Sequence, residues 1–286
     1  MPRPPTQPDI FAATAPTVAL PIRVGVGGWT FEPWRNNFFP AGLPHSRELQ
    51  YASRQLTAIE VNGTYYGTLQ PASFKKWHDE TPDDFLFSLK ASRYATNRRV
   101  LAEAGDSIRR FIDSGIVELG RKLGPIVWQF MPGKVFEPSD FEAFLALLPR
   151  QVDGHALRHV VDVRHESFMT TSFLALARRY KVATVITDAD KFPSFADLTG
   201  DFVYARLMMS EAGLSTGYAP QALDAWAGRA RLWAEGGAPA DLPMLEDPAA
   251  RGQPRDVFVY FINGAKERAP AAAMALLSRL GCLPAA

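Results

Sequence analysis

The sequence predicts an α/β fold, a TIM-barrel-like parallel (β/α)8 barrel, on three observations. Short apolar runs rich in Val, Ile, Phe and Tyr recur about eight times along the chain. Segments with helical spacing of apolar residues separate most of these runs. This alternation is typical of a parallel sheet with helices packed outside it. Third, the count of eight strands and about seven helices makes the (β/α)8 barrel the leading architecture.

The predicted strands are short and dense in residues that favour β-structure. In chain order they span residues 22–29, 58–66, 85–92, 125–132, 159–167, 182–190, 202–210 and 256–264. Helices are predicted at 45–56, 71–80, 104–122, 138–148, 171–180, 220–235 and 268–281. The segment KFPSFADLTG, which joins strands six and seven, is barely long enough for a parallel crossover. We therefore expect one outer helix to be shortened or lost there.

The stretch AIEVNGTYYG, residues 58–67, allows three interpretations. Asn62-Gly63 between apolar residues is a hairpin signal, and Asn62-Gly63-Thr64 is also a glycosylation acceptor pattern. In the third interpretation, Glu60 and Asn62 are polar residues at the buried end of a strand. The parallel neighbours expected here exclude a hairpin, and we expect no secretion. We therefore place this stretch as the second barrel strand, reaching the mouth.

Length and composition are those of an ordinary globular protein that can build a sizeable core: 286 residues, 47% hydrophobic and 21% charged. No internal repeat is evident. We expect a flexible Pro-rich arm over residues 1–21 and a single barrel domain over residues 22–286.

The net charge of +1 produces no overall field that would indicate a nucleic-acid or membrane partner. The chain has one cysteine, Cys282, and no run of roughly 20 apolar residues that could span a membrane. The N-terminal segment lacks the basic start and apolar core of a secretory signal. These features favour a cytoplasmic protein without a membrane partner, and they leave the oligomeric state open.

Polar residues stand late in most of the predicted strands, where the active sites of such barrels lie. They are Glu60, Asn62, Lys90, Gln129, Asp162, Arg164, Asp188, Asp190, Arg206 and Asn263. Because side chains alternate along a strand, Glu60 and Asn62 share a face, while Val61 points outward. The set can therefore converge inside the mouth. Its carboxylates and cations can also pair with one another and form a purely structural network.

Two predicted loops and one histidine add detail. Aromatic residues after the first strand form either a lid over the mouth or a satellite core; they are Phe31, Trp34, Phe38 and Phe39. After the third strand, Arg93, Arg98 and Arg99 form either a solvated surface or a site for phosphate or carboxylate. His165, beside Arg164 on the opposite face, is a candidate acid or base, or a hydrogen-bonding support.

No cofactor is predicted. The glycines of GVGGW, residues 25–29, lack dinucleotide-binding spacing, and no Walker loop occurs. Small residues there allow close strand packing or close approach of a ligand. Glu60, Asp162, His165 and Asp188 leave a divalent metal open, but they match no metal motif, and Lys90 and Arg164 compete for the same carboxylates.

The quoted motifs, taken in order, resemble the YecE-like family, catalogued as domain of unknown function 72. The motifs are GVGGW (25–29), EVNGTYY (60–66), KAS (90–92), QFMP (129–132), DVRHESF (162–168) and VYFIN (259–263). The resemblance covers about residues 22–281 and implies a TIM-barrel-like fold, but no reaction. The family's polar positions carry over onto Trp29, Glu60, Asn62, Thr64, Tyr66, Lys90, Gln129, Arg164, His165, Arg206 and Asn263.

Two departures from the family pattern indicate a divergent member. The family usually has Glu where this chain has Asp162. It usually has Arg-Leu-His-Gly where this chain has Arg206, Leu207, Met208 and Met209. The missing His-Gly puts in doubt any catalytic role for the seventh strand.

The leading functional hypothesis is an enzyme that performs hydrolysis or another acid–base step on a small anionic or polyhydroxylated molecule at the barrel mouth. The catalytic candidates are Glu60, Asp162, Asp188 and His165. The substrate-binding candidates are Trp29, Asn62, Tyr66, Lys90, Arg93, Gln129, Arg164, Arg206 and Asn263. Two alternatives stay open: a non-catalytic ligand-binding or sensing barrel, and nucleic-acid binding or processing through Arg93, Arg98 and Arg99.

Overall fold

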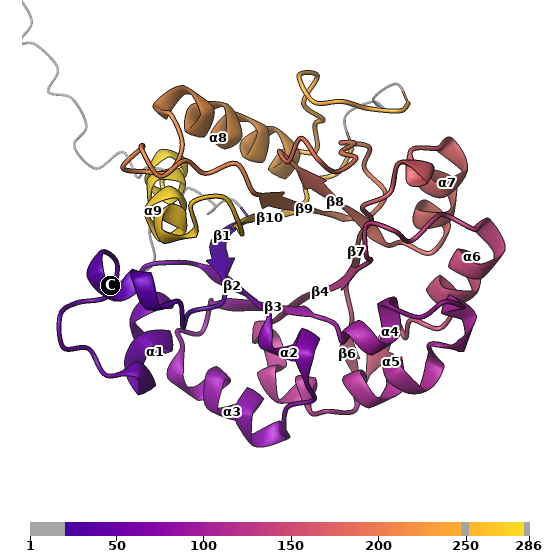
Figure 1. The fold of residues 1–286 in the computed structure, drawn as a ribbon, viewed down its shortest axis with the longest axis horizontal. Coiled ribbons are helices and arrows are strands. Elements are labelled where there is room, and N and C mark those ends of the chain that lie inside the picture. The colour runs from indigo at the N-terminus through magenta and orange to yellow at the C-terminus, as the bar shows by residue number, and fades with distance from the viewer. Residues whose placement is uncertain (1–20, 247–251, 283–286) are drawn as a thin grey trace, which may run out of the picture.

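A closed barrel of parallel strands forms the centre of the computed structural model, which describes residues 21–246 and 252–282 (Figure 1). Around the barrel, the order is β1-β10-β9-β8-β7-β4-β3-β2. The strands are β1 Ile22–Gly27, β2 Ala58–Val61, β3 Leu86–Lys90, β4 Leu123–Gln129, β7 His159–Asp162, β8 Ala183–Thr187, β9 Phe202–Leu207 and β10 Asp256–Phe261. The predicted (β/α)8 barrel is confirmed. Except for Pro21, the predicted N-terminal arm lies outside the described residues.

Helices surround the barrel as an outer ring (Figure 1). They are α1 Glu48–Ala52, α2 Gly63–Tyr66, α3 Pro71–Glu80, α4 Arg93–Thr96, α5 Gly105–Ile112, α6 Pro138–Ala146, α7 Thr171–Arg179, α8 Pro220–Ala234 and α9 Ala269–Leu280. Short 3-10 helices lie at Glu32–Asn36, His45–Arg47, Leu101–Glu103, Ile116–Lys122, Glu166–Phe168 and Lys266–Arg268. A small antiparallel pair, β5 Gln151–Val152 and β6 His155–Ala156, lies outside the barrel sheet.

The predicted elements differ from the observed ones mainly at their ends. The predicted helix 104–122 divides at Gly115, whose φ of 99° breaks the helical path. Helix α3 begins and ends as predicted, with Pro71 in its first turn. At their C-terminal ends the predicted strands extend beyond the observed ones, into residues that begin loops and short helices, such as Gly63–Tyr66 of α2.

The passage from β8 to β9, residues 188–201, is fully described and contains no helix, as the short crossover predicted. The segment before β10 packs against this passage. The Asp197 carboxylate accepts hydrogen bonds from the backbone N–H groups of Leu245 and Glu246, and the Ala196 N–H donates to the carbonyl of Pro243. The irregular segment around residues 243–246 therefore packs against the β8–β9 connection, which has no helix.

The core has two layers separated by the barrel wall. Inside the barrel lie alternate strand residues such as Ala58, Val127, Tyr204 and Tyr260. The residues between them point outward and pack beneath the helices. On the inner side, Gly25 is required: a Cβ there would lie 1.9 Å from the Ala58 carbonyl oxygen and 3.2 Å from the Tyr260 ring. The glycine of the first strand thus permits close strand pairing beside a large interior tyrosine.

The aromatic loop after β1 is mainly a satellite core. Trp34, Phe38 and Phe39 are buried and contact one another edge-on or tilted, and the Trp34 indole N–H donates to the Lys266 carbonyl at 2.8 Å. The sequence allowed either a lid over the mouth or a satellite core, and the structure supports the satellite core for these three residues. Phe31 is only partly buried.

Within the described part of the chain, none of the helices has the length and apolar character needed to cross a membrane.

Beneath the helices, His159 on β7 is buried in its neutral form. Its Nδ1 accepts the Trp128 indole N–H at 3.0 Å, and its Nε2–H donates to the Pro149 carbonyl at 2.7 Å. Burial lowers the pKa of His159 to about 4. Protonation of Nδ1 would also remove the acceptor of the Trp128 indole N–H, because two N–H donors would then face each other.

We expect acid to destabilise the fold through His159. The unfolded chain, with an ordinary pKa near 6.5, binds a proton that the folded chain excludes. This contribution is fully present above pH 6.5 and is lost as the pH falls toward 4, by roughly 3 kcal/mol. The free energy of unfolding, measured by urea titration across this range, should fall less in His159→Gln than in the wild type. Equal pH dependence of the two proteins would contradict this account.

Candidate functional site

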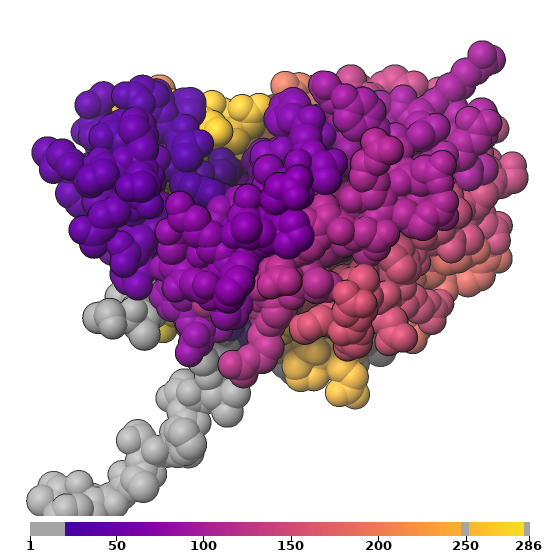
Figure 2. Space-filling view, turned by 90° about the horizontal axis from the view of Figure 1, so that it is seen from below, coloured from indigo at the N-terminus to yellow at the C-terminus, as the bar shows by residue number. Residues whose placement is uncertain are grey.

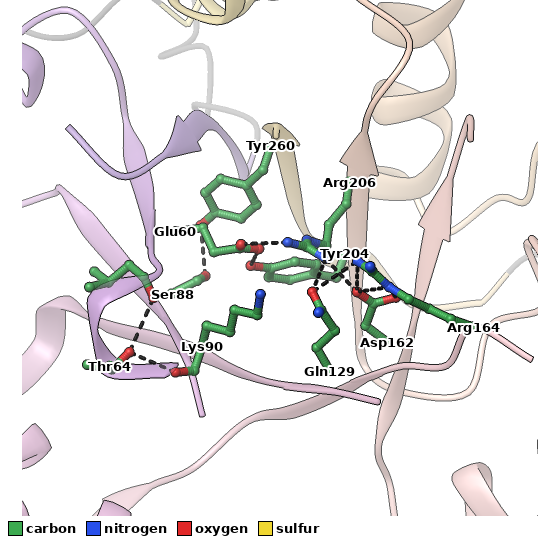
Figure 3. Close-up of polar contacts among 11 residues, drawn as sticks. Glu60, Thr64, Ser88, Lys90, Gln129, Asp162, Arg164, Tyr204, Arg206 and Tyr260 are labelled. Atoms are coloured by element: carbon green, nitrogen blue, oxygen red, sulfur yellow. Dashed lines mark hydrogen bonds and ion pairs between the residues drawn. The ribbon is translucent and has the colours of Figure 1, made fainter. Parts of the chain in front are cut away.

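A layer of polar side chains closes the C-terminal end of the barrel interior. It consists of Glu60 on β2, Lys90 on β3, Gln129 on β4, Asp162 on β7 and Arg206 on β9, all buried (Figure 3). Each follows interior residues at a spacing of two, such as Ala58 before Glu60 and Tyr204 before Arg206. The predicted convergence of these residues is therefore observed.

Arg206 is the centre of this layer. Its Nη2 donates to Glu60 Oε1 at 2.9 Å, and its Nη1 donates to Asp162 Oδ2 at 2.5 Å and to Gln129 Oε1 at 3.1 Å. Burial alone lowers the pKa of Arg206, but the Glu60 and Asp162 carboxylates raise that pKa more, so it lies above its ordinary value. Arg206 is thus a permanent cation that holds strands on opposite sides of the barrel.

The remaining acceptors of the layer are also occupied. Tyr204 donates its hydroxyl hydrogen bond to Glu60 Oε2 at 2.9 Å. The Arg164 guanidinium, which follows β7, donates to Asp162 Oδ2 and to Gln129 Oε1, both at 2.9 Å. The same group lies 4.5 Å from the centre of the Phe192 ring. Both carboxylates therefore have fixed cationic or hydroxyl partners.

Lys90 differs from the other charged groups of the layer. Among the described residues, its ammonium has no hydrogen-bond or ion-pair partner and contacts the Tyr65 ring, 4.2 Å from the centroid. Figure 3 shows this nitrogen pointing into the space between Glu60 and Gln129. Burial, followed by the Arg206 charge, lowers the pKa of Lys90 to about 8, although Glu60 and Asp162 act in the opposite direction.

The mouth also contains a cavity of about 480 Å³ beside this layer. Trp29, Asn62 and Tyr66, three of the predicted substrate-binding residues, line it together with Lys266. In Figure 2 the molecule is hollowed between the indigo segment that follows β1 and the purple segment that follows β2. The lining of the cavity includes Gly27 and Val61, the last residues of β1 and β2, but none of the five residues of the polar layer.

Four sequence-predicted residues lie apart from this layer and this cavity. The Asp188 carboxylate accepts the Met208 N–H at 2.6 Å and the Tyr218 hydroxyl at 2.7 Å, and burial raises its pKa. His165 Nδ1 bonds Ser167 and caps the 3-10 helix after β7. Asn263 is exposed, and its backbone carbonyl accepts a hydrogen bond from Ser210. Arg93 begins α4 and lines a separate cavity.

Met208 and Met209 stand where the resemblance leads us to expect His-Gly, and their backbone holds Asp188 in place. The Met208 N–H donates to Asp188, and the Met209 N–H donates to the Tyr218 hydroxyl at 2.9 Å. The carboxylate of Asp188 is thus used in supporting the loop after β9.

Two residues of this region were missed from the sequence. Lys266 lines the mouth cavity with its ammonium 4.7 Å from the Phe31 ring centre, and burial lowers its pKa. Lys266 lies in the 3-10 helix after β10, and no spacing or motif in the sequence indicates that it reaches the mouth. Tyr204 could have been found, because it stands two residues before Arg206 and must share its face.

The predicted metal-ligand candidates do not come together. Over residues 21–246 and 252–282, no three His, Cys, Asp or Glu side chains form a group that could hold a metal ion. Glu60 and Asp162 are instead bonded by Arg206 from two sides.

We expect Arg206→Met to destabilise the fold by about 3–5 kcal/mol, because it leaves two buried carboxylates without their shared cation. Urea unfolding monitored by circular dichroism measures the loss. The matched change Arg164→Met should cost much less, since Arg206 still holds Asp162 and Gln129. Equal losses in the two variants would show that Arg206 is not the centre of the network.

Comparison with known proteins places this architecture in a family. The model for the protein of unknown function DUF72 matches residues 23–285. The UPF0759 protein YecE of Escherichia coli K12 is 25% identical over 150 residues, which are 51% of this chain and 50% of that protein. YunF of Bacillus subtilis is 28% identical over 117 residues, 39% of this chain and 40% of that protein. The matched segments thus span half or less of these curated relatives.

The fold is also similar to a solved structure. The DUF72 family protein TM1631 of Thermotoga maritima superposes with a TM-score of 0.68 and 20% identity, covering 91% of this chain and 99% of that one. At this identity the likeness shows the fold alone. Because the family model covers nearly the whole barrel, the chain belongs to the DUF72 family.

Proposed function

We propose that this protein is an enzyme that carries out acid–base chemistry, such as a hydrolysis, on a small anionic or polyhydroxylated substrate at the barrel mouth. Lys90 is the group that exchanges the proton. The observation that carries the proposal is that the Lys90 ammonium is buried without a polar partner among the described residues, while the other charges around it are paired.

The Lys90 amine is suited to proton transfer near neutral pH. With a pKa of about 8, about one molecule in ten carries the neutral amine at pH 7, whereas an ordinary lysine would be almost fully protonated. A group with both forms populated can accept a proton in one step and return it in another. The lack of a hydrogen-bond partner leaves the nitrogen available to substrate.

The charge balance of the layer favours an anion. Two carboxylates, Glu60 and Asp162, face three cations when Lys90 is protonated. Since the carboxylates already pair with Arg206 and Arg164, the excess positive charge lies on Lys90. A bound anion beside this ammonium would raise its pKa and change its protonation during binding.

The adjoining cavity suits a polyhydroxylated or otherwise polar molecule. Its walls include the faces of Trp29 and Tyr66 and the amide of Asn62, and its volume of about 480 Å³ is within the usual range for small-molecule sites. Aromatic faces pack against the C–H surfaces of a substrate, while the amide fixes its orientation. Asn62, which directly follows β2, would orient the substrate within this cavity.

In this proposal Glu60 and Asp162 are positioning residues. Both Glu60 oxygens accept hydrogen bonds, and its side chain is fully buried, so its contribution is to hold Arg206. Asp162 holds Arg164 toward the mouth, where the partly exposed guanidinium can bind an anionic substrate group. The acid–base role that the sequence suggested for Glu60 is thereby assigned to Lys90.

A thermal-shift screen of small anionic and polyhydroxylated metabolites tests this proposal, with the wild type, Lys90→Met and Lys76→Met compared. Lys76 lies on the outer helix α3 and is the matched control for loss of one lysine charge. We expect compounds that stabilise the wild type and Lys76→Met but not Lys90→Met. Turnover of such a compound, followed by NMR, should fall about 10²–10⁴-fold in Lys90→Met.

Two outcomes would contradict the proposal. One is a compound bound equally well by Lys90→Met and turned over at the wild-type rate. The other is a compound that needs Lys90 for binding but is recovered chemically unchanged from the wild type under all conditions, as from a sensing barrel.

A further inference from the structure

A second and larger cavity, of about 650 Å³, lies between helices α2, α4 and α5, in the segments that follow β2 and β3. Its lining differs from that of the mouth cavity except for Leu69, which contributes to both. None of the polar-layer residues lines either cavity, so the two are distinguished by their own linings. This cavity is therefore a separate candidate site.

Three arginines line this cavity: Arg93 on α4, Arg98 in the loop that follows α4, and Arg110 on α5. Within the described part of the chain, none of them forms an ion pair. Asp106, an acidic residue that also lines the cavity, is paired with Arg109, which is not part of the lining. The three guanidinium groups thus retain an uncompensated positive charge.

The structure changes the membership of the basic patch that the sequence suggested. Arg98 donates to the Tyr94 carbonyl at 3.2 Å and to Ser107 Oγ at 3.0 Å, so its position is fixed. Arg99 does not line the cavity, and its carbonyl accepts a hydrogen bond from Lys134. Arg110 lines the cavity instead of Arg99. It lies on α5, too far along the chain from Arg93 for the sequence alone to indicate that the two are neighbours.

Exposed aromatic rings accompany these cations. Tyr66 and Tyr94 are 63% and 61% exposed, and the Arg93 guanidinium lies 5.7 Å and 5.5 Å from their ring centres. Large exposed rings that flank an unpaired arginine present flat faces for stacking beside a phosphate-binding group. Tyr94 is itself part of the cavity lining.

We propose that this side cavity binds a nucleotide, with the phosphate held by Arg93 and Arg110 and the base stacked on Tyr94. Guanidinium groups match phosphate oxygens in charge and geometry. The cavity volume is within the range of small-molecule sites. A free nucleotide and the nucleotides of a single strand share this chemistry. The site is independent of the function proposed for the mouth.

Isothermal titration calorimetry with adenosine 5′-monophosphate and with inorganic phosphate tests the site. We expect the wild type to bind the nucleotide more tightly than phosphate. The double change Arg93→Ala with Arg110→Ala should weaken nucleotide binding roughly ten- to hundredfold. Tyr94→Leu should weaken binding of the nucleotide but not of phosphate. Arg99→Ala, which removes the same charge outside the cavity, should bind as the wild type does.

Fluorescence anisotropy with a labelled single-stranded oligonucleotide distinguishes the two sources of nucleotide. Tighter binding of the strand, with a steep salt dependence that the double variant reduces, supports a strand. Equal or weaker binding of the strand supports a free nucleotide. The proposal is overturned if neither probe binds, if the double variant binds as the wild type does, or if phosphate binds as tightly as the nucleotide.

Discussion

The ion pairs of Arg206 with Glu60 and Asp162 are the interaction on which the mouth of this barrel depends. They connect β2 and β9 with β7 across the interior, where water is excluded and each charge would be costly alone. Such a cluster adds less stability than its short distances suggest, because desolvation offsets much of the attraction. In this arrangement both carboxylates and Gln129 accept hydrogen bonds from Arg206, so none of these buried acceptors is left without a donor.

This arrangement also explains why Lys90 differs from its neighbours. The carboxylates that would ordinarily stabilise a lysine cation are bonded to Arg206 and Arg164, so the ammonium contacts the Tyr65 ring and has no ion pair of its own among the described residues. Burial without a dedicated counter-ion is the usual physical cause of a lysine that loses its proton near neutral pH. The structural network and the reactive amine are thus two consequences of one set of contacts.

The fold and the convergence of the polar residues could be predicted from the sequence, because both follow from periodicity. A spacing of two places Glu60, Asp162 and Arg206 inside the barrel, and parallel strands bring their ends to one mouth. The pairing could not be predicted. Three carboxylates and three cations allow many combinations, and only the barrel geometry separates Asp188 from Arg206.

Long-range assembly limited the other predictions as well. The side cavity combines α4 with α5, so Arg110 is joined to Arg93 by tertiary packing and not by a motif. The loop after β1 became a core because Trp34 contacts Lys266, more than two hundred residues away. The end of the second strand was predicted too late because Tyr65 and Tyr66 favour β-structure, whereas the chain turns into the short helix α2 there.

Titration of the Lys90 side chain shows whether the pairing of the carboxylates with arginine leaves Lys90 as an available amine. NMR of protein labelled with ¹³C and ¹⁵N in lysine, with the Lys90 signal assigned from its absence in Lys90→Met, reports its protonation between neutral and alkaline pH. The account predicts a midpoint near pH 8. A midpoint at the ordinary lysine value of about 10.5 would contradict it.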